Sequence, residues 1–289
     1  MVIAVMAKQL EHIMYRYSSN TKQTSFRDSS PLSNDVIRHY APSVLAEAAH
    51  ESRGERYTYI PTIKVIDSLR NEGFQPYEVR QTRCRDAGRR EHTKHLVRLR
   101  HESVAVNDKQ EVGEIILINS HDGTSSYQIL SGFFRFICSN GLIAGDICND
   151  VRVRHSGNVI DDVIEGSYEV LSNLQEIEHR IADYKAITLS PDEQLLLADE
   201  SIKLRWDEQN LPIAASQLLR PRRYGDANAD LWSAFNRIQE SLLRGGNVGR
   251  SQTGRRLRTR EVTGVNESVK LNKALWSLTE RFAQLKQAA

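Results

Sequence analysis

The sequence predicts an α+β fold, with an N-terminal helix, an antiparallel β-meander of three to five strands and a helical C-terminal part. Apolar residues recur at helical spacing before Gly73, alternate with a period of two from about residue 76 to 138, and return to helical spacing after Gly145. Strands in one run and helices in another are typical of this class. We expect a loosely ordered N-terminus, a core containing the meander, and a helical region, over residues 1–30, 31–158 and 159–289.

Two segments support the N-terminal assignments. Residues 18–30 are rich in Ser, Thr, Asn and Gln, which predicts little order. Residues 31–51 have a helical pattern that is interrupted near Pro42. A further helix begins at Pro61, where proline suits the first turn, and ends at Gly73 as a left-handed cap.

Four strands are predicted after Gly73. They cover residues 76–86, 93–106, 114–120 and 126–138, and a further short strand is allowed at 151–155. Residues 115–118 are apolar on both faces, so that strand should be central. In the second strand, Lys94, Leu96, Arg98 and Arg100 share one face.

The C-terminal region predicts four helices. Residues 160–181 form one amphipathic stripe, and residues 190–193 read Ser-Pro-Asp-Glu, a capping box that starts the second. The third covers residues 226–243, and the fourth begins near Asn266. Residues 244–260, between the last two, contain four glycines and no core pattern, which predicts a loop that orders on binding.

The formal charge of +2 hides blocks of opposite sign. Residues 80–100 hold eight basic and two acidic side chains, residues 244–260 hold six arginines and no acid, and residues 159–200 hold eleven acids and two bases. Arginine, with 29 copies against 10 lysines, is the better planar partner for phosphate. This patterning favours a polyanion-binding surface with an acidic region elsewhere.

Composition also bounds location. No stretch approaches the roughly 18 apolar residues of a membrane span. Three cysteines without metal spacing argue against a disulfide framework and favour a reducing cytoplasm.

The first candidate site is a basic strand pair that would follow a phosphate backbone. The alternative is a solvated sheet face with scattered ion pairs. The predicted nucleic-acid contacts on these strands are Arg80, Arg83, Arg85, Lys94, Arg98 and Arg100.

The second candidate site is the arginine-rich loop, which would order over the bound strand. The alternatives are a disordered connector, or a loop that pairs with the acidic helix around Asp161 within or between subunits. The predicted contacts here are Arg250, Arg255, Arg256, Arg258 and Arg260.

Two further motifs have both a chemical and a structural interpretation. His121 and Asp122 could bind a metal or act as a base, but Asp-Gly at 122–123 favours a hairpin turn. Phe133, Phe134 and Phe136 could stack on bases, but the core interpretation is favoured. We identify no catalytic residue, metal site or cofactor motif, so a protein without enzymatic activity is expected.

A set of short motifs, in this order, resembles one family. They are Ala-Pro-Ser at 41–43, Arg-Tyr-Thr-Tyr-Ile-Pro-Thr at 56–62, Thr-Lys-His at 93–95, Asn-Ser-His-Asp-Gly at 119–123, Cys-Ser-Asn-Gly-Leu at 138–142 and Asp-Leu-Trp at 230–232. The family is the plasmid- and prophage-borne, uncharacterised bacterial family catalogued as domain of unknown function 932. The resemblance covers roughly residues 31–285 and implies a cytoplasmic bacterial protein of mobile elements, but it supplies no activity.

The order helix, meander, helix, with residues 65–74 leading into the first strand, is also similar to single-strand annealing proteins. That similarity implies a basic groove for single-stranded DNA and ring or filament homo-oligomers. We therefore expect a DNA-binding protein of a mobile element, whose partner is single-stranded DNA and which promotes strand annealing in recombination. The alternatives are an inhibitor that binds a host defence or recombination enzyme and, least favoured, a metal-dependent nuclease using His121 and Asp122.

Overall fold

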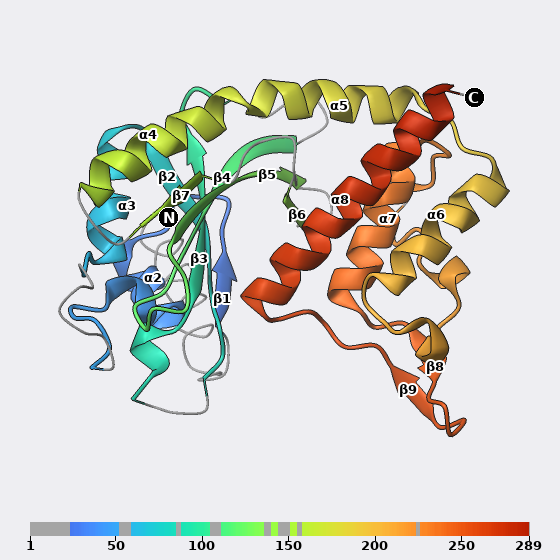
Figure 1. Ribbon diagram of the computed structural model, residues 1–289, viewed down its shortest axis with the longest axis horizontal. Coiled ribbons are helices and arrows are strands. Elements are labelled where there is room, and N and C mark those ends of the chain that lie inside the picture. Colours follow the sequence, from blue (N-terminus) through green and yellow to red (C-terminus); the bar gives the residue numbers. More distant parts are fainter. Residues whose placement is uncertain are drawn as a thin grey trace, which may run out of the picture.

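Figure 1 shows the computed structural model, in which an antiparallel sheet lies beside a group of C-terminal helices. The structure describes residues 24–51, 59–84, 88–104, 111–135, 140–143 (140–142 as backbone), 151–154, 158–223 and 226–288.

The sheet confirms the predicted meander but has more strands. Six strands follow one another in chain order, and β7 pairs with β5 beside β6, so that the sheet has seven strands rather than three to five. The strands are β1 (Ser25–Arg27), β2 (Phe74–Gln81), β3 (His95–His101), β4 (Glu111–Asn119), β5 (Tyr127–Arg135), β6 (Asn140–Ile143) and β7 (Val151–Val153). Every pairing is antiparallel.

The predicted position of residues 115–118 is confirmed, because β4 lies between β3 and β5 and is buried along its whole length. The expectation that residues 1–30 are loosely ordered is wrong for β1, which pairs with β2 through Ser25 opposite Arg80 and Arg27 opposite Glu78. Its three residues contribute edge hydrogen bonds rather than a long apolar run, so the composition gave no signal. Residues 1–23 lie outside the described part of the chain.

One face of the sheet packs against the N-terminal helices and α4. These helices are α2 (Asn34–Tyr40), α3 (Thr62–Asn71) and α4 (Val159–Ser172), with the short helix η1 (Pro42–Leu45) after α2. Val97, Leu117 and Ile129 of the sheet share a buried cluster with Leu69 of α3 and Val163 of α4. This packing confirms the interruption near Pro42 and the helix that ends before Gly73, whose φ of 86° suits glycine.

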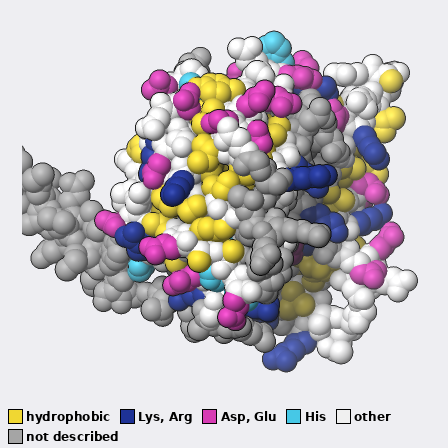
Figure 2. All heavy atoms as spheres, turned by 60° about the vertical axis from the view of Figure 1, so that its left-hand side comes forward, with side chains coloured by type: hydrophobic (Ala, Val, Ile, Leu, Met, Phe, Trp, Pro, Cys, Tyr) yellow, Lys and Arg dark blue, Asp and Glu magenta, His cyan; other side chains and the backbone are white. Residues whose placement is uncertain are grey.

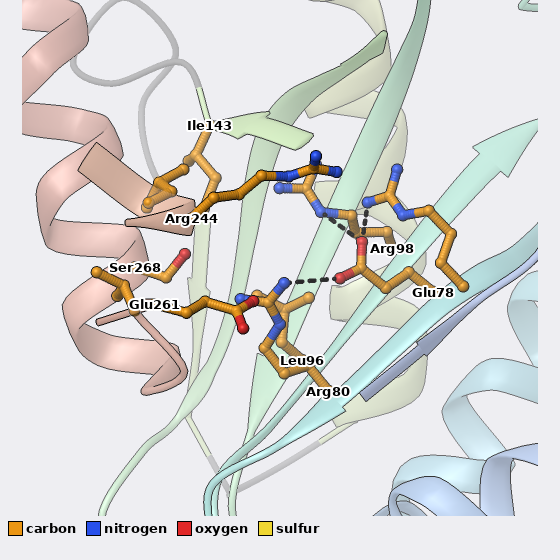
Figure 3. A pocket seen from close by; sticks show the side chains of 11 residues that line it. Glu78, Arg80, Leu96, Arg98, Ile143, Arg244, Glu261 and Ser268 are labelled. Carbon is orange, nitrogen blue, oxygen red and sulfur yellow. Dashed lines mark hydrogen bonds and ion pairs between the residues drawn. The ribbon is translucent and has the colours of Figure 1, made fainter. Parts of the chain in front are cut away.

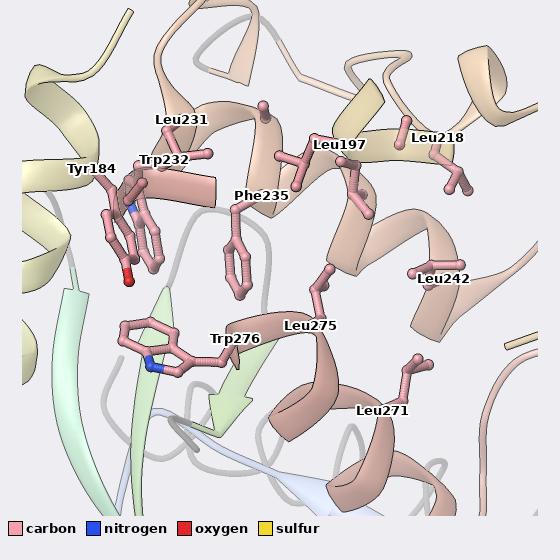
Figure 4. Packing of buried hydrophobic residues seen from close by; sticks show 14 of the residues in the cluster. Tyr184, Leu197, Leu218, Leu231, Trp232, Phe235, Leu242, Leu271, Leu275 and Trp276 are labelled. Atoms are coloured by element: carbon pink, nitrogen blue, oxygen red, sulfur yellow. The ribbon is translucent and has the colours of Figure 1, made fainter. Parts of the chain in front are cut away.

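The C-terminal helices form a second core. They are α5 (Leu174–Ala186), α6 (Pro191–Lys203), α7 (Leu231–Arg244) and α8 (Val265–Ala288), joined in part by η3 (Glu208–Asn210) and η4 (Ala215–Gln217). Figure 4 shows Tyr184, Trp232, Phe235 and Trp276 gathered at its centre. The rings of Trp232 and Phe235 stack with centroids 5.3 Å apart. None of the helices in the described residues is long and apolar enough to cross a membrane.

Helix starts follow the sequence closely, but one helix divides. The capping box at Ser190 is confirmed, since its hydroxyl accepts from the Glu193 N–H and the Glu193 carboxylate accepts from the Ser190 N–H. The single helix expected over residues 160–181 is instead α4 and α5, which meet at Asn173. That division lets α4 cover the sheet while α5 reaches the C-terminal helices (Figure 1).

Polar contacts join the sheet to these helices at the N-terminal end of β4. The Glu111 carboxylate accepts from Lys185 Nζ at 2.8 Å and from Trp232 Nε1 at 3.0 Å. Arg135 lies between Glu111, at 3.2 Å, and Asp226, at 3.0 Å. These contacts hold the helical core against the sheet and so fix the distance between the sheet and the C-terminal helices.

Candidate nucleic-acid interface

The second face of the sheet carries a row of alternating charge across three strands. Arg27 of β1 lies opposite Glu78 of β2, which lies opposite Arg98 of β3. Arg27 forms an ion pair with Glu78, and Arg98 Nε lies 3.4 Å from a Glu78 carboxylate oxygen. Arg80, two residues along β2, reaches back to Glu78 at 3.1 Å. Opposite charges at directly opposed strand positions stabilise the register.

Glu114 of β4 is the second acidic centre on this face. Its carboxylate lies 3.0 Å from both Arg98 and Arg100, and its side chain is fully buried. Burial alone would raise the pKa of Glu114, but Arg27, Arg98 and Arg100 together hold it below its usual range. The carboxylate therefore stays ionised among the arginines.

The prediction that the basic side chains of this strand pair face solvent is wrong for Arg98 and Arg100. Their side chains are 5% and 9% exposed and are occupied by Glu78 and Glu114. Alternation placed them on one face correctly, but it could not show that acids from neighbouring strands and the C-terminal helices cover that face. Contact of both residues with the backbone of a strand lying along the sheet would require this face to open, although Arg98 also lines a small pocket described below.

The other predicted residues of the strand pair have varied surroundings. Arg80 is 27% exposed, and Lys94 is half-buried with its Nζ donating to Asn266 of α8 at 2.9 Å. Arg83 is exposed just after β2, whereas Arg85 lies outside the described residues. Their role in nucleic-acid binding stays a prediction.

Residues 244–260 contain an ordered β-hairpin, whereas the sequence predicted a loop that becomes ordered only on binding. Strand β8 (Val248–Arg250) pairs with β9 (Arg256–Arg258). Positive φ angles at Gly245 and Gly246 allow the chain to leave α7, and Gly254 provides the turn with a φ of 76°. Glycines that suggest a flexible loop in the sequence here shape an ordered one.

Contacts with the segment before α7 hold the hairpin in place. Arg250 N donates to Pro212 O at 3.0 Å, and Gln217 Nε2 donates to Val248 O at 3.0 Å. At the base, Arg205 Nη2 donates to Arg260 O at 2.6 Å. A Cβ on Gly249 would lie 1.8 Å from Pro212 O, so glycine is required for this approach.

All five predicted arginines of this segment are exposed on the hairpin and its base. Within the described residues no ion pair joins any of them to a carboxylate. Figure 1 shows the hairpin projecting away from the helices, at the opposite end of the molecule from α4. The residues are Arg250, Arg255, Arg256, Arg258 and Arg260.

The acidic block lies on α4 to α6, with Asp161, Asp162, Glu165 and Glu169 exposed along α4. Figure 2 turns the α4 side of the molecule toward the viewer and shows acidic side chains gathered near the top of that face. Because α4 and the hairpin lie at opposite ends (Figure 1), a pairing between them within one chain is excluded by this geometry.

A pocket lies between the charged sheet face and the helices, beside the base of the hairpin. It has a volume of about 140 Å³ and is lined by Arg27, Glu78, Arg80 and Arg98 from the sheet, and by Arg244 and Glu261 from either side of the hairpin. Figure 3 shows Arg244 reaching across it toward Arg98. Sequence reasoning missed Arg27 and the two strand acids, Glu78 and Glu114. The sequence did contain a signal for the two acids. Each lies two residues from a basic or apolar residue of a predicted strand, and residues two apart share a strand face.

Several of the short motifs meet in a polar cluster on the other side of β3. The Thr62 hydroxyl lies 3.0 Å from His95 Nε2 and 3.1 Å from His121 Nε2, and Asn119 Nδ2 donates to it at 3.0 Å. Ser43 Oγ lies 2.9 Å from His95 Nδ1. All five side chains are buried, and burial lowers the pKa of His95 to about 4. The cluster joins η1 and α3 to the ends of β3 and β4.

His121 and Asp122 have separate partners. His121 faces Thr62 in the buried cluster, whereas the Asp122 carboxylate accepts from the Thr124 N–H at 3.0 Å and from its hydroxyl at 2.6 Å. Asp122 thus shapes the turn between β4 and β5. The described residues contain no group of three or more His, Cys, Asp or Glu side chains placed to hold a metal ion. Phe133 and Phe134 are buried, as the core interpretation predicted, and Phe136 lies outside the described residues.

A family model described as "Domain of unknown function (DUF932)" matches residues 49–276. The chain belongs to this family. It is 50% identical over 254 residues to the UPF0380 proteins YafZ and YfjQ of Escherichia coli (strain K12), an alignment that covers 88% of this chain and 92% of each relative. No solved structure matches the chain significantly. The resemblance seen in the motifs is confirmed, and the family carries no stated activity.

Proposed function

We propose that this DUF932 protein binds single-stranded DNA without catalysing a reaction, and that the arginine hairpin is its main contact with the phosphate backbone. One observation carries the proposal: the five exposed arginines are displayed on an ordered, projecting hairpin, with no carboxylate ion-paired to them among the described residues. Guanidinium groups held in this way release counterions from a nucleic acid when they bind its phosphates.

The hairpin geometry supports contact with a flexible strand. Arg250 and Arg256 lie opposite each other, and Arg258 lies opposite Val248, so the cations follow both strands of the hairpin. Single strands can bend to meet such a projection, and their affinity depends mainly on charge and stacking rather than on base identity. Strand annealing follows as a further proposal, because base pairing supplies its free energy and the protein need only neutralise and present the strands.

The test is fluorescence anisotropy with a labelled single strand of about 30 nucleotides over a salt series that begins near 50 mM. A variant with Arg255, Arg256 and Arg258 changed to glutamine should bind more weakly and lower the salt slope by about 2, since each single-strand phosphate contact contributes about 0.7. A control that removes two charges elsewhere changes Arg152 and Arg154, exposed arginines at and just after β7, to glutamine and should keep the wild-type slope.

Duplex DNA and RNA of the same sequence are measured in parallel to test strand preference. Two results would overturn the proposal: absence of binding near 50 mM salt, or an affinity that stays constant as salt rises. An unchanged slope in the triple variant would remove the hairpin from the interface.

The separation of charge favours a second proposal, self-association. The exposed acids of α4 and the exposed arginines of the hairpin lie at opposite ends of one chain, so two copies can meet head-to-tail and continue into a ring or filament (Figure 1). The acidic surface would equally suit a basic partner protein, as required by the alternative in which this protein inhibits a host defence or recombination enzyme. Light scattering at low and high salt should show an assembly that dissociates as salt rises, and a monomer at both salts would contradict it.

A further inference from the structure

The pocket beside the hairpin base has an excess of positive charge. Four arginines line it, namely Arg27, Arg80, Arg98 and Arg244, against two glutamates, Glu78 and Glu261. Adding the buried neighbours Arg100 and Glu114 leaves this excess at two charges, and Arg244 shares a further carboxylate outside the lining, Glu240 at 3.0 Å, with Arg223. A buried charge that lacks a counter-charge is costly, so an excess of this kind predicts an anion as its ligand.

Two guanidinium groups also have unused donors. Arg80 Nε and Arg27 Nη1 are buried and form no hydrogen bond within the described part of the chain, although Arg27 Nη1 lies 3.9 Å from a Glu114 carboxylate oxygen. Both side chains are more than two-thirds buried, and both belong to strands that line the pocket. Buried polar groups normally have partners, so these donors indicate a missing acceptor.

The electrostatics of the arginines agree with this geometry. Burial lowers the pKa of Arg27 to about 9; Glu114 opposes the shift, and Arg98, Arg100 and Arg80 add to it. Burial likewise lowers the pKa of Arg80, with Glu261 opposing. Because arginine stays protonated in proteins, these environments would be relieved by a further negative charge rather than by loss of a proton.

The pocket also lies at the first turns of α8, and Ser268 lines it (Figure 3). The N-terminal end of a helix carries a partial positive charge that favours anions. The cavity of about 140 Å³ exceeds the roughly 10–15 Å³ that one water needs, so it has room for a larger polar group.

We propose that this pocket binds one phosphate group, held between Arg27, Arg80 and Arg98 from the sheet and Arg244 from the end of α7. Guanidinium forks that converge from several elements match the oxygens of a tetrahedral oxyanion. Arg244 and Glu261 flank the hairpin, so the phosphate could be the end of a strand bound there or free phosphate. The first source rests on the proposed function, whereas the second does not.

Thermal unfolding at about 10 mM phosphate, with chloride at matched ionic strength as the reference, tests the pocket without nucleic acid. Wild-type protein should melt about 2–4 °C higher in phosphate, because a ligand that binds the native state stabilises it. Arg244→Gln should reduce phosphate affinity about tenfold and remove most of this shift. Arg244 is 40% exposed, and its buried partner Glu240 keeps its ion pair with Arg223 at 2.6 Å, so this variant should fold.

Arg255→Gln is the matched control, because Arg255 lies on the hairpin outside the pocket lining. It should keep the phosphate shift. Arg80→Gln, which removes an unused donor, should lose the shift as Arg244→Gln does. Equal melting in phosphate and chloride, or a full shift in both pocket variants, would overturn the proposal.

Oligonucleotides with a 5′-phosphate or a 5′-hydroxyl identify the source. Tighter binding of the phosphorylated strand, lost in Arg244→Gln, assigns the pocket to a strand end. Equal binding of both strands, together with the shift in free phosphate, assigns it to a free anion. Failure of the pocket leaves salt-dependent binding through the hairpin intact, whereas failure of the proposed function removes oligonucleotide binding but leaves the phosphate shift.

Discussion

Two arginine-rich regions with the same net charge in the sequence have opposite environments in the structure. Arg98 and Arg100 on β3 are buried and paired with Glu78 and Glu114, whereas Arg256 and Arg258 on β9 are exposed. The first set pairs with carboxylates of neighbouring strands, whereas the second lies open to a long polyanion. The comparison shows that the position of nearby carboxylates, rather than the density of arginine, decides which basic segment can bind a polyanion.

Glu114→Gln should have the largest effect on the stability of the buried arginine cluster. The change leaves Arg98 and Arg100 buried with one carboxylate fewer, and removing one partner of a buried ion pair costs about 3–5 kcal/mol of unfolding free energy. Chemical denaturation measures it. Glu165→Gln, an exposed acid on α4, is the control and should unfold like the wild type. A Glu114→Gln variant of nearly wild-type stability would show that the buried arginines do not depend on this carboxylate.

The opposite face of β3 gives a pH test. His95 is fully buried with a pKa of about 4, against about 6.5 in the unfolded chain. The unfolded state therefore binds the proton first, so this contribution to stability is complete above about pH 6.5 and is lost as the pH falls toward 4. The full loss is about 3 kcal/mol, of which about 2 kcal/mol falls between pH 7.5 and pH 5.

Denaturation curves are measured over that range for wild type and His95→Asn. Subtracting the two unfolding free energies at each pH isolates the effect of His95, because the contributions of the other titrating groups cancel. The variant should be less stable at neutral pH and should show a shallower decline toward pH 5. Parallel declines would mean that another group carries the pH dependence.

Gly249→Ala tests whether the hairpin is a fixed element. The added Cβ would lie 1.8 Å from Pro212 O, so the hairpin must shift, at a cost of about 1–3 kcal/mol. Nucleic-acid affinity should fall with it although no charge is lost. Thr253→Ala at the exposed turn is the control for both measurements. Unchanged stability and affinity would show that the hairpin works equally well when released from Pro212.

The smallest expected effect on stability is at the hairpin arginines themselves. Arg256→Gln should change the unfolding free energy by less than about 0.5 kcal/mol, because the side chain is exposed. The same variant should lower the salt slope of oligonucleotide binding by about 0.7. A large loss of stability instead would place Arg256 in the structural group with Arg98.

Much of the fold was predictable because its signals are local. The capping box at Ser190, the left-handed cap at Gly73 and the alternation along β4 all act within a few residues, and each was confirmed. The break between α4 and α5 was not predictable, because the apolar stripe continues through Asn173 and only the two surfaces that the helices cover require it.

The α+β order of elements, the family and the arginines that share a strand face all follow from the amino-acid sequence alone. The tertiary structure decided whether those arginines bind solvent or carboxylate. Arg27, Glu78 and Arg98 meet because β1, β2 and β3 pair in one register, although they are widely separated in the chain. The hairpin is held in place because Pro212, Gln217 and Arg205, all from before α7, form hydrogen bonds with its backbone. Charge patterning counts residues along the chain, whereas desolvation and pairing depend on neighbours that only folding brings together.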